Sequence, residues 1–465
     1  LAGKQDQPRF SIQGRIQAGG IVPRSFILGL TATAGSLVYH NTWGSSGKTP
    51  NAYYTRVIAL SDLPVKELVQ VWVNGEPVTL GATPTNMGYP VLEYRKDGKD
   101  HLWIKFYDGT QTVADSFLTG SVASTDRPYQ ATRVGHGIAY AICTAQIHEE
   151  LFTGFPEFLF VLDGAKLYDP SQDSTVGGDG SQSWDDPTTW GGDGDHLPAV
   201  QLYNLLRGIT YGGQWLYGLQ NVPAARLPVA AWIAQIEKCR EQIQGPNGLE
   251  PTYRTGGEIP VSAPIADAID AILTGCQGRL AEIGGIYKIH VGGPDTPSAA
   301  ITDDDILSTE EQTFTPFFGL ADTVNGISAT YPCPEEGWSQ KSAPPLYRPD
   351  LEAEAGGRRL MADVALDFVP YSGQVQRLMK SALLEAQRAR RHTIALPPKY
   401  WTVEPGDFIA WSSERNGYVN KLFRVDGVMD RGNLDIIIDI TEVDPSDYDW
   451  DHAVDYQPPF FAPVG

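Results

Sequence analysis

Apolar and polar residues alternate along several stretches of the chain, which is the pattern of half-buried strands. The clearest examples are YYTRVIALSD from Tyr53, LVQVWVNGEPVTL from Leu68 and HLWIKFYDGTQTV from His101. Asn74-Gly75 and Asp108-Gly109 interrupt them, and such pairs readily adopt the positive φ of hairpin turns. Residues 139–148 and 157–162 continue the pattern. We expect residues 50–170 to form one β-barrel or sandwich.

The flanking segments have a weaker pattern. Residues 1–50 are rich in Gly, Ser and Thr, with strands expected within 21–38 and a loop at 41–51. Residues 170–196 contain almost no aliphatic side chains, so we expect a long polar loop there, of a kind that is often functional or exposed.

A helical section follows this loop. Residues 199–208 predict a short helix, and the apolar spacing within 229–243 makes one helical stripe. Pro264 suits the first turn of another helix, which is expected to reach Leu280 and to end at Gly284-Gly285. Residues 286–291 then form a strand, so that 197–298 is predicted to be a small α+β domain.

The remainder of the chain returns to strands. They are expected at 314–318 and 323–331, before a Pro-rich stretch at 332–349 that is typical of a linker. A helix is predicted over 374–391, and its basic end suits the negative pole of the helix dipole. Four more strands are expected at 392–396, 407–412, 421–429 and 433–441.

These patterns predict a mostly β fold with an α+β insert. Its parts are two small β-barrel domains plus a helical α+β domain. The predicted boundaries are 1–49 for an N-terminal arm, 50–196 for the first barrel with its polar loop at 171–196, 197–298 for the α+β domain, 299–373 for a β-rich segment with the Pro-rich linker, 374–455 for the second barrel with its leading helix, and 456–465 for a C-terminal linker.

Composition excludes several classes of protein. The 465 residues include 35 basic and 56 acidic side chains, a formal charge of −21. Phosphate repels such a chain, which argues against a protein that grips nucleic acid. No run of 18 apolar residues exists, so stable membrane insertion is not expected. The chain opens without Met and without a signal segment, and this start suggests a longer or processed protein.

The cysteines give neither a metal signature nor a disulfide framework. They lie far apart and form no CxxC pair. Two fall on the apolar faces of predicted helices, so reduced core thiols are expected. The four are Cys143, Cys239, Cys276 and Cys333.

Catalytic motifs are absent or incomplete. Gly47-Lys48-Thr49 resembles the end of a P-loop, but Thr42 stands where the motif needs Gly. His148-Glu149-Glu150 lacks the second His of a zinc helix. No GxSxG elbow and no dinucleotide-type GxGxxG is present, and no carboxylate pair stands out as a glycosidase site. We therefore predict no enzyme, no cofactor and no catalytic or metal-ligating residue.

Four weaker features leave alternatives open. Asp193-Gly194-Asp195-His196, near Asp185-Asp186, is either a solvated acidic loop or a fragment of a calcium loop without its spacing. Asp303-Asp304-Asp305 is expected to cap a turn before Ile306. The basic residues at 388–392 are a helix terminus or a polyanion site. Trp184 and Trp190, if exposed, suit sugar stacking or a protein contact.

Residues 154–170, GFPEFLFVLDGAKLYDP, resemble a segment of the hub proteins at the tail tip of long, non-contractile-tailed phages. The matching pattern is G-x-P-x-x-x-F-x-x-x-G-x-K-x-Y-D-P. This family includes the tip attachment proteins of lambda-like phages and the baseplate hub of gene transfer agents. Pro198-Ala199 matches the helix that follows in the family, although Asn204-Leu205-Leu206 replaces its D-Y-L.

Weaker matches follow in the family's order. They are LPVKELVQVWVNGEPV from Leu63, AIDAILTGCQGRLAEIGGIYKIHVG from Ala268, ITDDDIL from Ile301, the helix and Pro405-Gly406-Asp407 strand of a second hub barrel, and TEVDPSDYDWD from Thr441. Together they span about 55–455, nearly the whole chain.

The resemblance implies a homotrimer whose paired barrels form a ring that closes the distal end of the tail tube. It implies contacts with the distal tail protein, the C-terminus of the tape measure, a small tip protein and a receptor-binding or central fibre module. The protein would then belong to the virion of a siphophage-like particle, made in the bacterial cytoplasm, and serve host attachment and genome ejection.

The negative charge suits this role. An acidic wall lets DNA pass without specific binding, so we expect a share of the 56 acids to line an axial channel. Functional contacts are expected, if anywhere, in the 171–196 loop and the 332–349 segment, both of which are otherwise plain surface loops. The alternative function is a carbohydrate-binding or glycan-cleaving β protein of a tail spike.

Overall fold

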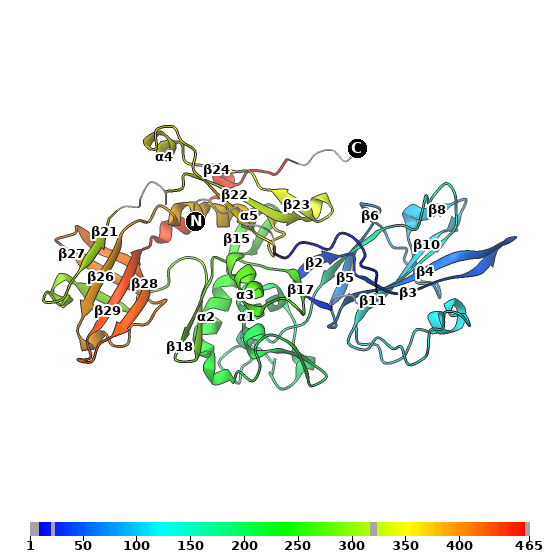
Figure 1. Ribbon diagram of the computed structural model, residues 1–465, viewed down its shortest axis with the longest axis horizontal. Coiled ribbons are helices and arrows are strands. Elements are labelled where there is room, and N and C mark those ends of the chain that lie inside the picture. The colour runs from blue at the N-terminus through cyan, green and yellow to red at the C-terminus, as the bar shows by residue number, and fades with distance from the viewer. Residues whose placement is uncertain (1–8, 20–23, 317–322, 461–465) are drawn as a thin grey trace.

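The computed structural model describes residues 9–19, 24–316 and 323–460. They form an elongated molecule with strands at both ends and helices in the middle (Figure 1). The N-terminal strands lie at one end of the long axis and the C-terminal strands at the other. The fold is thus mostly β with some helices, as the sequence predicts.

The N-terminal end consists of two sheets packed face to face. Their strand orders are β3-β4-β11-β10-β7 and β2-β12-β5-β6. Alternating residues fill the space between them, among them Ile58, Ile104 and Phe160. The strands are β2 (Leu30–Thr33), β3 (Ser36–Ser46), β4 (Thr49–Ser61), β5 (Glu67–Val73), β6 (Glu76–Val78), β7 (Tyr89–Pro90), β10 (Leu102–Tyr107), β11 (Ala139–Gln146) and β12 (Phe158–Asp163).

Of the two hairpin turns predicted in this region, one is confirmed and the other is wrong. Asn74-Gly75 connects β5 to β6 in a tight hairpin, with φ of 53° and 86°, as expected. Asp108-Gly109 makes no tight hairpin, because a long irregular segment separates β10 from its partner β11.

The prediction of a loop at 41–51 is wrong. β3 runs to Ser46 and β4 begins at Thr49, with Gly47 at a φ of 59° in the turn between them. Trp43 stacks on Tyr53 across the hairpin with ring centroids 4.8 Å apart. This cross-strand contact outweighs the weak strand propensity of the Gly, Ser and Asn residues. The hairpin projects beyond the sheet in Figure 1.

The centre of the molecule holds the helices. They are α1 (Pro198–Arg207), α2 (Val229–Arg240), α3 (Ile265–Thr274) and α5 (Ser372–Glu385). Trp232, Ile236 and Cys239 make the buried stripe of α2, as the spacing predicts. β1 (Ser25–Leu28) pairs with β17 (Gly257–Pro260) and joins this core to the N-terminal sheets.

Three of these helices end earlier than predicted, because their last apolar residues enter neighbouring elements. Ile243 lies in β15 and Leu280 in β18, while α5 stops at Glu385 so that β26 can begin at Arg391. Gly284-Gly285 does not end a helix, since it forms the turn between β18 and β19.

The described residues also form small two-stranded hairpins. One lies at the N-terminal end, β8 (Arg95–Lys96) with β9 (Lys99–Asp100). The others belong to the central part: β13 (Ile209–Tyr211) with β14 (Gln214–Tyr217), β15 (Gln242–Gly245) with β16 (Gly248–Pro251), and β18 (Arg279–Ile283) with β19 (Ile286–His290).

The Pro-rich stretch at 332–349 is not an extended linker. β22 (Gly326–Cys333) pairs with β23 (Ser339–Ser342), β24 (Leu346–Tyr347) and β25 (Met361–Ala365), and α4 (Pro349–Glu354) follows. The prolines stand at strand ends and at the first turn of α4, where they remove no ladder hydrogen bond. Trp338 anchors this layer on Ala32 and Val161 of the N-terminal sheet.

The C-terminal end is a six-stranded sheet of order β20-β27-β28-β29-β26-β21. Its bounds are β20 (Ala299–Thr302), β21 (Thr313–Thr315), β26 (Arg391–Leu396), β27 (Phe408–Ser413), β28 (Tyr418–Asp430) and β29 (Ile436–Glu442), and α6 (His452–Asp455) follows. The predicted strand at 314–318 extends partly outside the described residues. The pairings of the described strands leave both sheets of the sandwich and this sheet open, so the prediction of two small barrels is not confirmed.

All four cysteines are free and buried, as predicted. Burial raises the pKa of the Cys239 thiol to about 12, which keeps it protonated. No helix among the described residues is long and apolar enough to cross a membrane. Within those same residues, no three His, Cys, Asp or Glu side chains gather where they could hold a metal ion.

Candidate assembly surfaces and sites

The polar loop at 171–196 is a folded element held by its own carboxylates. Asp169 accepts hydrogen bonds from the backbone N–H and the hydroxyl of Ser171, at 2.9 and 2.7 Å. Asp173 accepts from the Tyr168 hydroxyl at 2.7 Å and from Thr175. Such side-chain turns replace the missing aliphatic contacts, since the oxygens satisfy the backbone donors of the loop.

Arg240 of α2 fastens the start and the end of this loop to the helical core. Its guanidinium donates to the Asp169 carboxylate at 2.7 Å, to Asp193 at 2.8 Å and to the Ser171 hydroxyl at 3.1 Å. Asp169 is 2% exposed. The ion pair is therefore largely dry, and it joins positions 71 residues apart in the sequence.

The run at 193–196 uses its carboxylates for the fold. Asp195 accepts the backbone N–H groups of Leu167 at 2.9 Å and Gly192 at 3.0 Å. Burial raises the pKa of Asp195 to about 6. His196 contacts the Asp163 carboxylate at 2.9 Å, and Asp163 also pairs with Lys66 at 3.1 Å. Asp195 is thus part of the fold and its oxygens already accept hydrogen bonds from the protein, while the Asp193 side chain stays 63% exposed.

Trp184 and Trp190 are half-buried rather than exposed. Their rings lie 5.3 Å apart, and the Arg207 guanidinium covers Trp184 at 3.9 Å. The Trp190 indole N–H donates to the Ser183 carbonyl at 2.8 Å. Because one face of Trp184 is taken by Arg207, the interpretation of these residues as an exposed sugar platform is wrong.

The basic residues at 388–392 meet the acidic stretch at 442–455. Arg388 donates to Asp447 at 2.8 Å and lies 3.3 Å from Asp444. The Arg390 backbone N–H donates to Glu442 at 3.0 Å. His392 is buried in the six-stranded sheet, where burial lowers its pKa to about 4. The segment follows α5 and is not part of its last turn, and acids of this chain take up its Arg388 charge.

The remaining motifs have structural roles. Gly47-Lys48-Thr49 forms the tip of the β3–β4 hairpin, with no helix beside it. Residues 303–305 form the expected turn, and Asp305 accepts the Thr302 backbone N–H at 2.8 Å. His148 lies against His101 from the start of β10, an arrangement that the local sequence does not reveal.

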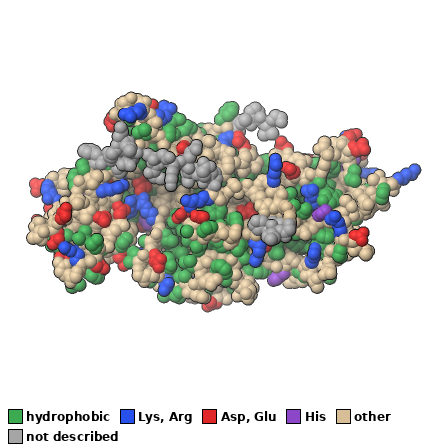
Figure 2. All heavy atoms as spheres, in the orientation of Figure 1, with side chains coloured by type: hydrophobic (Ala, Val, Ile, Leu, Met, Phe, Trp, Pro, Cys, Tyr) green, Lys and Arg blue, Asp and Glu red, His purple; other side chains and the backbone are tan. Residues whose placement is uncertain are grey.

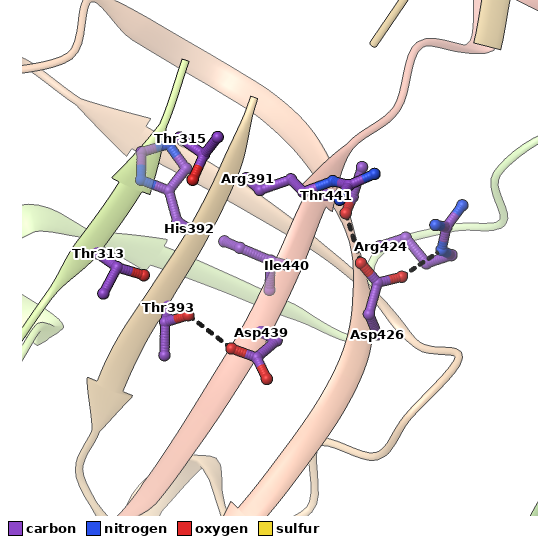
Figure 3. A pocket seen from close by; sticks show the side chains of 10 residues that line it. All are labelled: Thr313, Thr315, Arg391, His392, Thr393, Arg424, Asp426, Asp439, Ile440 and Thr441. Atoms are coloured by element: carbon purple, nitrogen blue, oxygen red, sulfur yellow. Dashed lines mark hydrogen bonds and ion pairs between the residues drawn. The ribbon is translucent and has the colours of Figure 1, made fainter. Parts of the chain in front are cut away.

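A cavity of about 480 Å³ opens on one face of the C-terminal sheet (Figure 3). Its wall is polar, and the carboxylates there are engaged. Asp439 accepts from the Thr393 hydroxyl at 2.6 Å, and Asp426 accepts from Arg424 at 2.7 Å and from the Thr441 hydroxyl. The lining combines hydroxyl groups with the Arg424–Asp426 ion pair.

The sheets present edges that can take further strands. β3 and β6 end the two N-terminal sheets, and β20 and β21 end the C-terminal sheet. The Leu37 N–H donates to the Gln17 carbonyl at 2.8 Å, and beyond it the outer edge of β3 has no backbone partner in the part of the chain that the structure describes. An open edge of this kind is a template for another chain.

Charge is spread over the molecule rather than gathered into one patch. On the face shown in Figure 2, acidic and basic side chains are scattered and apolar side chains gather over the middle, where α2 and α3 lie. Of the residues singled out in the sequence, Asp169 and Asp193 meet at Arg240, but the 171–196 and 332–349 segments form no common site.

Comparison with known proteins gives a family match for about a third of the chain. Residues 264–428 match the family Phage-tail_3, described as "Putative phage tail protein". They run from the start of α3 into β28. No curated protein sequence matches the chain.

Solved structures extend the likeness to most of the chain. A chain of the "Virion of native gene transfer agent (GTA) particle" aligns with a TM-score of 0.59 and 14% identity, over 96% of this chain and 90% of that one. A tail protein of Neisseria meningitidis MC58 aligns over 91% of this chain and 98% of that one, at 9% identity and a TM-score of 0.31. The first match establishes a shared fold, and the second is too distant to support an argument. The family match and the shared fold support a phage tail protein.

Proposed function

We propose that the protein is a structural hub of the tail tip, or baseplate, of a siphophage-like particle or gene transfer agent. It closes the distal end of the tail tube and connects it to the receptor-binding parts. The observation that carries the proposal is the shared fold with a chain of the gene transfer agent virion over 96% of this protein. The family match at 264–428 supports it independently.

The proposed assembly is a homotrimer. Each subunit contributes the N-terminal two-sheet unit and the C-terminal six-stranded sheet, which stand at opposite ends of the molecule (Figure 1). Three copies then place six β-rich units around one axis. The open edges of β3, β20 and β21 support this arrangement, because a ring uses such edges for its neighbours.

The proposed partners are the distal tail protein, the C-terminus of the tape measure, a small tip protein and a receptor-binding or central fibre module. In this proposal the domains keep the predicted order, but β2 and β3 belong to the N-terminal unit and β20 and β21 belong to the C-terminal sheet. The protein catalyses no reaction, and DNA passes through an axial channel without specific binding. The charge of −21 supports such a channel, since acidic side chains repel phosphate.

Light scattering tests the trimer directly. The chain has a mass of 50.7 kDa, so three copies have a mass of about 152 kDa. We expect the trimer at high protein concentration, alone or with the distal tail protein. A monomer under both conditions would overturn the trimeric hub.

A glycan array separates the hub from a carbohydrate-binding tail spike. We expect no glycan to bind, because Arg207 covers Trp184 and both tryptophans are half-buried. Saturable binding of one glycan class that Trp190→Ala abolishes would favour the spike instead.

A further inference from the structure

Two imidazole rings lie against each other at the N-terminal sandwich. His101 immediately precedes β10, and His148 follows β11 by two residues. Their ring centroids are 4.6 Å apart and the ring planes are inclined by 70°. His101 is 6% exposed. The Nδ1 atoms of both rings are shielded from solvent and have no hydrogen-bond partner within the described residues.

The backbone holds His101 in place. Its N–H donates to the Tyr94 carbonyl at 3.1 Å, and its carbonyl accepts the Gln146 N–H at 2.8 Å. The backbone of His101 is therefore fixed at the sheet, and its ring is buried there. The more exposed His148 belongs to the segment 147–156, which connects β11 to β12.

This segment is attached by side-chain packing and few hydrogen bonds, since Phe152 and Phe155 pack against the core of the N-terminal sandwich and Phe155 also meets Phe158 with ring centroids 5.8 Å apart. The Ile147 N–H donates to the Ala52 carbonyl at 2.9 Å. Phe152 stacks on Tyr94 with centroids 5.3 Å apart, and Phe155 meets the edge of Tyr54 at 4.8 Å. No helix or strand lies within 147–156, so its opening requires few hydrogen bonds to break.

The charges around the rings act in both directions. Beside the effect of burial, Lys99 lowers the pKa of His101 and Asp100 raises it. Lys96 and then His148 lower the pKa of Glu150. On the β8–β9 hairpin, Asp100 pairs with Arg95 at 2.7 Å, and Lys96 pairs with Glu150 of the segment at 2.5 Å. Lys99 adds a positive charge near His101. From β4, the Arg56 guanidinium covers Phe155 at 4.2 Å. Glu149 is exposed, and no carboxylate bonds to either Nδ1 among the described residues.

We propose that the His101–His148 pair is a proton-operated switch that holds the segment 147–156 closed while both rings are neutral and releases it on acidification. A proton on His101 places a cation in a dry contact with the His148 ring and beside the positive charge of Lys99. Opening of the segment hydrates both rings and relieves this cost. The released segment carries Phe152 and Phe155, so opening uncovers apolar surface. The proposal does not depend on the hub function.

The direction of the linkage follows from the burial of His101. Burial, then His148 and then Lys99 lower the pKa of His101 in the closed state. An opened or unfolded histidine has a pKa of about 6.5. The open state therefore binds more protons below that pH, and the closed state loses stability as the pH falls. The two rings do not make a metal centre of three or more ligands, since no such group occurs among the described residues.

Hydrogen exchange of the full chain between pH 7.5 and pH 5 tests the switch. After correction for the chemical exchange rate, opening of 147–156 is expected to increase as the pH falls below 6.5, by at most about tenfold per pH unit, the limit for one linked proton. His101→Gln is expected to remove this slope and His148→Gln to reduce it, because burial lowers the pKa of His101 more than His148 does. His136→Gln, on a different loop near Tyr211, is the matched control and is expected to leave it unchanged.

Either of two results would overturn the proposal. A slope of zero in the native protein, or an unchanged slope in His148→Gln, excludes the pair as its cause. His148 is less buried than His101, so this variant is expected to fold even if the buried His101→Gln does not.

Discussion

Replacement of Arg240 tests whether the 171–196 segment is a fixed part of the fold. Arg240→Met keeps the apolar stem but removes the donors to Asp169, Asp193 and Ser171. The Asp169 carboxylate, 2% exposed, then keeps only the two hydrogen bonds from Ser171. Loss of one partner of a buried pair costs roughly 3–5 kcal/mol. Because the Arg240 side chain is itself 18% exposed, we expect the lower end, about 3 kcal/mol.

The assay is hydrogen exchange of residues 169–196, because a chain of several units need not unfold in one step. A loss of about 3 kcal/mol corresponds to exchange about 150-fold faster. Glu237→Ala is the control: it removes the outer partner of Arg240, whose side chain is 52% exposed, and is expected to cost under about 1 kcal/mol. Asp169→Asn combined with Arg240→Met is expected to recover part of the loss, since no buried charge is left unpaired.

Equal exchange in Arg240→Met and Glu237→Ala would refute the reasoning. It would mean that the ion pair does not hold the segment and that 171–196 behaves as a plain surface loop.

Three further predictions concern stability and reactivity. Trp338 has a φ of 63° and is 4% exposed, so Trp338→Ala is expected to lower thermal stability by about 3 kcal/mol. Trp338→Gly is expected to cost about 1 kcal/mol less, because glycine adopts that φ freely. An alanine variant as stable as the glycine variant would contradict this. The pKa of His392 is about 4 in the folded chain and about 6.5 in the unfolded chain, so the C-terminal sheet is expected to lose about 3 kcal/mol of stability as the pH falls from 6.5 to 4. Hydrogen exchange is expected to show a weaker pH dependence in His392→Gln. The same pH dependence in this variant would count against the role of His392. All four cysteines are buried, so a thiol reagent at pH 8 is expected to label none of them quickly in the native chain and all four after denaturation. Rapid labelling of the native chain would contradict the burial of these thiols.

Local sequence patterns predict those helices and strands whose buried residues recur at the spacing of the element itself. The stripe of α2 and the Asn74-Gly75 hairpin are examples, because one buried face and one turn type specify each. The β3–β4 hairpin escapes prediction, since the contact between Trp43 and Tyr53 appears only once the register is known. Gly284-Gly285 shows a related limit: a glycine pair indicates a turn but not which elements it joins.

The features that the sequence does not predict depend on contacts between residues far apart in the chain. Asp169 and Arg240 are 71 residues apart, and His101 is 47 positions before His148, so no local spacing reveals either contact. Arg388 meets Asp447 for the same reason, which changes the interpretation of the basic segment from a helix terminus to an internal ion pair. The acidic composition indicates repulsion of nucleic acid but does not place a channel wall.

The most direct test of the hub is a reconstruction of the assembled particle with this chain placed in its density. We expect three copies at the distal end of the tail tube, around an axial channel with an acidic wall. Placement of the chain elsewhere in the particle, or a basic channel wall, would contradict it.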